Sequence, residues 1–153
     1  MRLLEARRAV APAEFMEVQG AGAAVQYLLD HEAYEVGIAT GGWQAPAQVK
    51  LRHLSFPIHR FYASYADDKH NREAILDEAL TKARQQHDIT RVVYVGDALW
   101  DVQTTRNMGM PFIGIRHRND LAVLQAAGAV DVLQDYRDLS RFEQLIEAAV
   151  PPR

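Results

Sequence analysis

Residues 92–101, Val-Val-Tyr-Val-Gly-Asp-Ala-Leu-Trp-Asp, decide the fold of this chain. The apolar, mostly β-branched residues at the start of this stretch are typical of a fully buried strand. The Gly-Asp pair that follows them indicates an abrupt turn into a helix. Asp97 is therefore expected at the carboxyl end of a strand, which is where open α/β sheets bind their ligands.

Two carboxylates are brought together by this turn. Asp97 and Asp101 are four residues apart, so they lie on one face of a helix that begins at once. They repel each other there unless a cation or a proton lies between them, and a divalent metal is the economical solution. The structural alternative makes Asp97 an N-cap and Asp101 a first-turn acid that complements the helix dipole. These residues alone leave both interpretations open.

The composition indicates one ordinary globular domain. Of the 153 residues, 48% are hydrophobic, and 17 basic against 20 acidic side chains give a net charge of −3. This charge balance predicts no broad basic surface for nucleic acid or an anionic membrane, so phosphate recognition is expected to be local. The lack of cysteine excludes disulfides and thiolate chemistry, and the histidines form no close zinc-ligand pair. With no expected membrane span or secretory leader, we predict a cytoplasmic protein.

Short apolar runs alternate with amphipathic segments along the whole chain. The expected strands cover residues 34–39, 61–64, 92–95, 111–115 and 130–133. The expected helices cover about residues 3–10, 22–31, 45–54, 71–86, 121–127 and 140–148, and a further helix follows the strand at 92–95 and runs to Met108. Ser140 and Glu143 are expected to form a capping box for the last helix. This alternation predicts a three-layer, Rossmann-like α/β fold, in which a parallel sheet is covered by helices on both faces.

A hydroxyl and two glycines end the first expected strand. The Thr40 hydroxyl and the backbone amides of Gly41 and Gly42 suit a phosphate oxygen, because glycine lets the backbone approach an anion closely. A tight turn with a capping threonine is the alternative interpretation.

Two cations open the helix expected at 71–86. Asp67 or Asp68 makes a sensible cap, but Lys69 and Arg72 stand where the positive helix end disfavours a cation by ~0.3–1 kcal/mol each. Cations kept at such an unfavourable position are consistent with a cation that binds an anion. Solvated surface charge gives the same pattern. Arg72 is the preferred candidate because it lies in the first turn and its fork suits phosphate, and Lys69 is the alternative.

In this order, these stretches resemble the second, third and fourth motifs of the haloacid dehalogenase superfamily of phosphohydrolases. Thr40 matches the second motif, Lys69 or Arg72 the basic third motif, and residues 96–101 the Gly-Asp-x-x-x-Asp fourth motif. The third motif departs from the usual Lys-Pro. Residues 107–115 are similar to the helix end and strand that follow in phosphoglycolate-phosphatase-like members.

The resemblance implies Mg²⁺-dependent hydrolysis of a small phosphorylated metabolite by the complete enzyme. It assigns catalytic roles to Thr40, Arg72 and Lys69, phosphate binding to Thr40, Gly41 and Gly42, direct metal ligation to Asp97, and a neighbouring or outer position at the metal to Asp101. The substrate itself is not specified, because specificity in the family depends largely on a cap inserted after the first motif.

That first motif, Asp-x-Asp-x-Thr, is absent from the sequence. It supplies the nucleophilic Asp, so this chain is expected to be inactive alone. In the related fold, the strand that bears this motif lies at the centre of the sheet. Without it, two strands each lose the neighbour to which their backbone would hydrogen-bond. We expect a truncated product, with residues 1–19 as a remnant of a cap or linker and residues 20–153 as the core. Alternatively, residues 1–19 or a partner chain, as in a homodimer, fill the gap.

Two other classes of function fit the same residues. A non-catalytic binding or regulatory module would keep the scaffold without its nucleophile. A receiver-like signalling domain phosphorylated on Asp97 is less favoured, because the acidic cluster that it needs at its first strand is absent too.

Overall fold

The structure is a computed structural model that describes residues 17–153. Helices and strands alternate there, and they follow the expected ranges within a few residues. In chain order they are α2 (Ala21–Asp30), β1 (Gly37–Ala39), α3 (Gln44–His53), η2 (Ile58–Arg60), β2 (Tyr62–Ser64), α4 (Arg72–Arg84), β3 (Tyr94–Gly96), α5 (Leu99–Asn107), β4 (Phe112–Ile115), α6 (Ala122–Ala126), β5 (Asp131–Leu133) and α7 (Leu139–Ala148). Only the single-turn 3₁₀ helix η2 was not expected. The helix expected at 3–10 lies outside the described residues.

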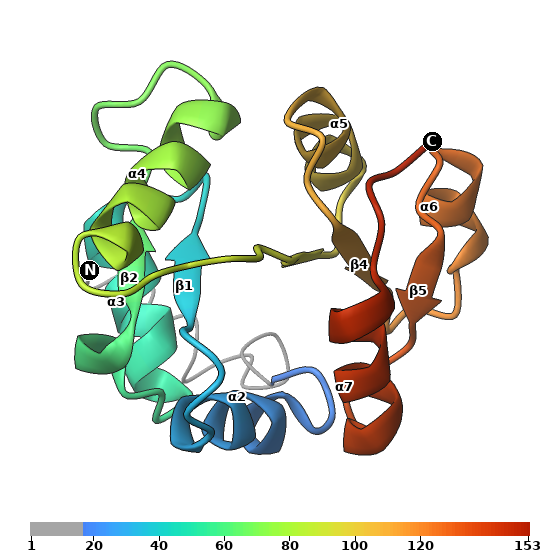
Figure 1. Cartoon of the computed structure of the whole chain (residues 1–153), viewed down its shortest axis with the longest axis horizontal. Coiled ribbons are helices and arrows are strands. Elements are labelled where there is room, and N and C mark those ends of the chain that lie inside the picture. Colours follow the sequence, from blue (N-terminus) through green and yellow to red (C-terminus); the bar gives the residue numbers. More distant parts are fainter. Residues whose placement is uncertain (1–16) are drawn as a thin grey trace, which may run out of the picture. The chain divides into compact units, whose positions relative to one another are not determined.

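The described residues form two compact units (Figure 1), one of residues 17 and 22–88 and one of residues 18–21 and 89–153. In the first unit, β1 pairs with β2 in parallel, with Gly37 opposite Tyr62. In the second unit, β3, β4 and β5 form a parallel sheet in that order. Within residues 17–153, β1 and β3 each pair with one strand. The predicted α/β fold with parallel, Rossmann-like pairing is confirmed.

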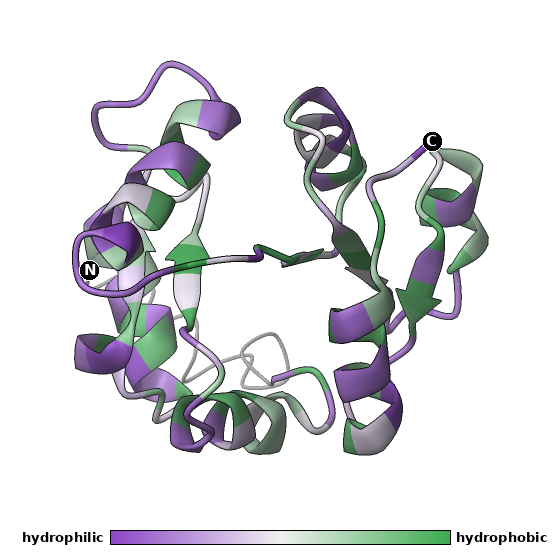
Figure 2. Ribbon diagram, viewed as in Figure 1, coloured by the Kyte–Doolittle hydropathy of each residue, from purple (hydrophilic) through white to green (hydrophobic). Residues whose placement is uncertain are grey.

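The first unit is built on helix α4, which packs against both β1 and β2 (Figure 1). The buried face of α4 consists of Ile75, Leu76, Ala79 and Ala83. Hydrophilic positions interrupt the hydrophobic ones along this helix (Figure 2), as the spacing of an amphipathic helix requires. Small alanines bring the helix close to the strands, but they bury little apolar area each.

The second unit has a more apolar core. Every residue of β4 is buried, and a cluster of Val102, Phe112, Leu124 and Ala129 packs α5 and α6 against the sheet. The ring of Tyr94 stacks on that of Phe112 with 6.2 Å between centroids. Buried β-branched and aromatic residues of this kind are typical of parallel strands covered on both faces.

Two helix caps differ from the expectation. The N-cap of α7 is Asp138, whose carboxylate accepts from the Arg141 amide at 2.9 Å, so the prediction of Ser140 is wrong. The N-cap of α4 is Asn71, whose side chain accepts from the Ala74 amide at 2.8 Å. In both helices the sequence offers several polar residues in a row, and the one whose backbone is not yet helical becomes the cap.

Candidate functional site

The Thr40 loop leaves the carboxyl end of β1 and is tied to the loop that follows β2. The Thr40 amide donates to the Ser64 carbonyl at 3.2 Å, and the Ala66 amide donates to the Gly42 carbonyl at 3.1 Å. The Thr40 Oγ1 atom accepts from the Gly42 amide at 3.1 Å. A hydroxyl that accepts through its oxygen keeps its own hydrogen for another acceptor, so Thr40 is oriented to donate to an anion.

Arg72 lies against this loop. A Cβ atom built at Gly41 would be 2.6 Å from Arg72 Nη2, so a side chain at this position would displace the guanidinium. The sequence predicted Arg72 and the Thr40–Gly42 loop as parts of one phosphate site, and both lie in the first unit. The structure therefore brings the guanidinium of Arg72, from the first turn of α4, next to the loop that carries the Thr40 hydroxyl.

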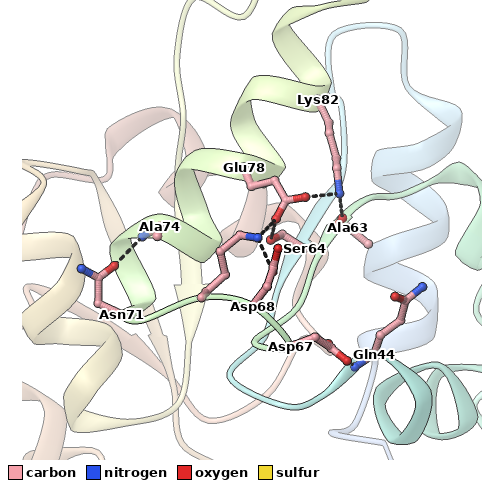
Figure 3. Close-up of polar contacts among 10 residues, drawn as sticks. Gln44, Ala63, Ser64, Asp67, Asp68, Asn71, Ala74, Glu78 and Lys82 are labelled. Atoms are coloured by element: carbon pink, nitrogen blue, oxygen red, sulfur yellow. Dashed lines mark hydrogen bonds and ion pairs between the residues drawn. The ribbon is translucent and has the colours of Figure 1, made fainter.

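Lys69 belongs to a network of charged side chains around Glu78, in which Figure 3 labels Asp68, Glu78 and Lys82. The Lys69 ammonium group pairs with Asp68 and, at 2.9 Å, with Glu78. Hydrogen bonds that Lys69 donates to Asp68 and Glu78 raise the pKa of Lys69 above its ordinary value. The positive charge of Lys69 is thus balanced by two carboxylates of its own unit, whereas Arg72 approaches the Thr40 loop.

Glu78 is the centre of that network. Its carboxylate accepts from Lys82 at 2.8 Å and from the Ser64 hydroxyl at 2.7 Å, in addition to Lys69. Hydrogen bonds from Lys82, Lys69 and Ser64, in that order, lower the pKa of Glu78 to about 2. Lys82 also donates to the Ala63 carbonyl at 2.7 Å and so occupies a backbone acceptor of β2. A lysine that binds a strand carbonyl in this way discourages pairing of that strand with another one.

The first unit also contains an open cleft of about 750 Å³ along β2. Its lining residues come from α3, η2, β2, the loop after β2 and α4, and they include Gln44, Tyr62, Asp67, Glu78 and Lys82. Neither Thr40 nor Arg72 lines it. Asp67, expected as a cap for α4, instead accepts from the Gln44 amide at 2.7 Å and so caps the start of α3.

In the second unit, the two motif carboxylates have different environments. Asp101 is buried at 5% exposure, and its Oδ2 atom accepts from the amides of Asp97 (3.1 Å) and Ala98 (3.0 Å). Its Oδ1 atom accepts from the Tyr94 hydroxyl at 3.1 Å. A Cβ atom on Gly96 would be 2.7 Å from Asp101 Oδ2, so the motif glycine makes room for this carboxylate. Asp101 therefore acts as a first-turn acid that fixes the loop.

Asp97, in contrast, is exposed at the carboxyl end of β3. Burial is the main cause that raises the pKa of Tyr136 to about 12, and the negative charge of Asp97 adds to it. The Asp97 carbonyl accepts from Arg116 Nη1 at 3.0 Å, and Arg116 in turn pairs with Asp120. The sequence analysis missed Arg116 and Asp120, although their position directly after β4 placed them at the carboxyl edge of the predicted sheet.

Comparisons with known proteins agree with this geometry. The family model of the haloacid dehalogenase-like hydrolases matches residues 4–115. The chain belongs to this family. The crystal structure of a hydrolase from Pseudomonas syringae is similar, with a TM-score of 0.69 and 26% identity over 83% of this chain. The matched region is 61% of that hydrolase, so this chain spans less than two thirds of its relative. No curated protein matches the chain.

Membership in the haloacid dehalogenase-like hydrolases confirms the predicted family and a hydrolase core. The phosphoglycolate-phosphatase-like subtype stays a prediction. So does the convergence of Thr40, Arg72 or Lys69 with Asp97 over one edge, because these residues are divided between the two units. No helix among residues 17–153 has the length and apolarity to cross a membrane.

The donor chemistry at Asp97 fits the Mg²⁺ that this family generally uses. An exposed carboxylate is a hard oxygen ligand, and Mg²⁺ is usually held by one or two carboxylates together with waters and substrate phosphate. In the part of the chain that the structure describes, no group of three or more acidic or histidine side chains could hold a metal. The residues therefore fit a sparse Mg²⁺ site and do not form an all-protein cage.

Proposed function

We propose that this chain is most of the core of a cytoplasmic, Mg²⁺-dependent phosphatase that hydrolyses a small phosphorylated metabolite. The observation that supports this proposal best is the approach of the Arg72 guanidinium to Gly41, beside the oriented hydroxyl of Thr40. A hydroxyl and a glycine amide on the loop after a parallel strand, together with a guanidinium from the start of α4, suit the oxygens of a phosphoryl group.

Each group has a distinct part in binding the phosphoryl group. The Thr40 hydroxyl and the Gly41 amide donate to its oxygens, while the Gly42 amide holds Thr40 in place. Arg72 neutralises its charge through two parallel hydrogen bonds. Lys69 is the alternative cation, but its pairs with Asp68 and Glu78 would have to loosen first.

Asp97 is the residue that we expect to hold the metal. Bound Mg²⁺ would neutralise phosphate charge and orient the phosphate oxygens. Asp101 has a supporting part, because both of its carboxylate oxygens already accept hydrogen bonds from residues 94–98. It fixes the backbone on which the Asp97 carboxylate is mounted.

The motif that supplies the nucleophile in this family does not occur in this sequence. No Asp-x-Asp-x-Thr segment occurs in the 153 residues, so this chain is expected to bind phosphate weakly and not to turn over. In the complete enzyme, a longer chain or a strand from a second copy would supply it. The same absence favours the second candidate, a non-catalytic binding or regulatory module on this scaffold. Native mass spectrometry of the natural product separates the two, since a much heavier chain supports the truncated enzyme.

Binding of inorganic phosphate in the presence of Mg²⁺, measured by calorimetry, tests the proposed site. Arg72→Met and Thr40→Val are expected to weaken binding about tenfold or more, since a hydrogen bond to a charged group is worth ~1.5–3 kcal/mol. Arg84→Met removes an exposed arginine from the same helix and should leave binding unchanged. Equal binding by all four proteins would overturn the proposed phosphate site.

A second assay tests the expected inactivity. The chain alone is expected not to hydrolyse p-nitrophenyl phosphate with Mg²⁺. Hydrolysis that Asp97→Asn abolishes would show that the nucleophile is present after all, and it would also exclude the non-catalytic module.

A further inference from the structure

Asp97 is held through its backbone on both sides while its carboxylate stays exposed. Its amide donates to Asp101 Oδ2 at 3.1 Å, and its carbonyl accepts from Arg116 Nη1 at 3.0 Å. Side chains from α5 and from the end of β4 therefore fix both of its peptide groups. The residue as a whole is exposed, so its carboxylate is accessible to a ligand.

Arg116 is itself fixed by three kinds of contact. Its amide donates to the Leu133 carbonyl at 2.8 Å, which ties it to the end of β5. Its Nε donates to Asp120 Oδ1 at 2.9 Å, and its Nη2 pairs with the other carboxylate oxygen of Asp120. A bidentate pair of this type has a defined geometry, so the remaining Nη1 of Arg116 points in a defined direction.

We propose that the Arg116–Asp120 pair is a positioning clamp for the metal-binding carboxylate of Asp97. This inference rests on the proposed function, which makes Asp97 the metal ligand. Because Asp120 neutralises Arg116, the pair adds no net charge next to a bound cation. Its effect on metal binding therefore comes from the orientation of the Asp97 carboxylate. Outer partners of a metal ligand typically change metal affinity by 10–100-fold.

The sparse ligand set makes this orientation important. With no cluster of further acidic or histidine ligands in residues 17–153, the affinity for a metal depends on how well the Asp97 carboxylate is directed before the metal arrives. A loop that moves freely would lose part of the binding energy in ordering itself. Asp101 and Arg116 reduce this cost, because they already hold the amide and the carbonyl of Asp97.

The experiment measures Mn²⁺ binding by electron paramagnetic resonance, with Mg²⁺ as competitor. The double variant Arg116→Met/Asp120→Asn removes both charges of the clamp and keeps the net charge of the chain. We expect it to weaken Mn²⁺ binding about tenfold or more. In an Asp97→Asn background the same two substitutions should have no further effect on Mn²⁺ affinity, because the carboxylate that they position is gone.

The pair Arg137–Asp135 provides the matched control. It is a 2.8 Å ion pair in the same unit, and it makes no contact with the Asp97 backbone. Arg137→Met/Asp135→Asn should leave Mn²⁺ binding unchanged. A merely structural role for the Arg116–Asp120 pair would lower the free energy of unfolding by the same amount in both Asp97 backgrounds, without the Asp97-dependent loss of affinity.

The outcomes are distinguishable. If wild type and Asp97→Asn bind Mn²⁺ equally, the proposed metal site is wrong and the clamp with it. If binding depends on Asp97 but Arg116→Met/Asp120→Asn retains it, the clamp alone is wrong and the proposed function stands. Asp97-dependent binding that only the clamp variant weakens supports both.

Discussion

The two units of this chain are stabilised in different ways. In the second unit, β4 is wholly buried and Val102, Phe112 and Leu124 form a compact apolar cluster. In the first unit, half of the buried positions of α4 are alanines, and its polar side carries the network around Glu78 (Figure 3). Apolar burial depends little on pH, whereas ion pairs and hydrogen bonds to a carboxylate disappear when it is protonated. The two units should therefore respond differently to the same perturbations.

The largest expected effect comes from the apolar cluster. Phe112→Ala should lower the free energy of unfolding by about 3–5 kcal/mol, because it leaves a cavity under α5 and α6 and removes the stacking on Tyr94. Denaturant unfolding measures the loss, and amide exchange followed by mass spectrometry should locate it first in residues 89–153. A loss below about 1 kcal/mol would contradict the view that this cluster is the main source of stability in the second unit.

The second prediction concerns the motif carboxylate in the same unit. Asp101→Ala removes the acceptor of two backbone amides and of the Tyr94 hydroxyl, and it should cost roughly 2–3 kcal/mol. Asp97→Ala, four residues earlier and exposed, should change the free energy of unfolding by less than about 0.5 kcal/mol. Equal losses for the two variants, measured by denaturant unfolding, would contradict the division of roles between them.

This pair of residues also shows what the sequence could predict. The Gly-Asp after an apolar run placed the loop at a strand end, and both interpretations of the pair were open: metal ligands or helix-terminal acids. The structure gives Asp101 the helix-terminal part, because its neighbours supply three donors. One of these donors is the Tyr94 hydroxyl. A tyrosine on a strand, seven residues before Asp101, cannot be recognised in the sequence as a hydrogen-bond partner of that carboxylate.

The fold was predictable because its elements depend on local patterns. Alternating apolar runs and amphipathic helices gave the element order, and the parallel pairing followed from it. Long-range polar partners were not predictable in the same way. The contact of Arg116 with the Asp97 carbonyl spans 19 positions, and that of Ser64 with Glu78 spans 14. Such contacts depend on which side chains the folded backbone brings within 3 Å, and spacing along one element does not encode this.

The third prediction tests a local feature of the first unit. Asn71→Ala removes the side-chain acceptor for the Ala74 amide at the start of α4, and it should cost about 1 kcal/mol. Asn71→Asp keeps the acceptor and adds a negative charge near the positive helix end, so it should be neutral or slightly stabilising. Thermal unfolding of the two variants compares them directly. A greater loss for Asn71→Asp than for Asn71→Ala would contradict the assignment of Asn71 as the cap.

A similarly small effect at neutral pH is expected for Glu78, and its dependence on pH is the distinguishing feature. Three donors lower its pKa from 4.5 to about 2, so the folded state favours the charged form, and this contribution to stability is complete only above the unfolded pKa. It is lost as the pH falls from about 4.5 towards 2. Because the side chain is 34% exposed, solvent screens these contacts, and Glu78→Gln should cost only about 1 kcal/mol at pH 7.

Denaturant unfolding of wild type and Glu78→Gln at a series of pH values measures this contribution. The difference between the two proteins should shrink through the range from about pH 4.5 to 2 and vanish at its lower end. Asp77→Asn removes an exposed carboxylate from the same helix and should give a smaller difference from wild type with no such decline. A difference between wild type and Glu78→Gln that stays constant across this range would mean that the network does not act through the charge of Glu78. The first unit would then depend on apolar burial as much as the second.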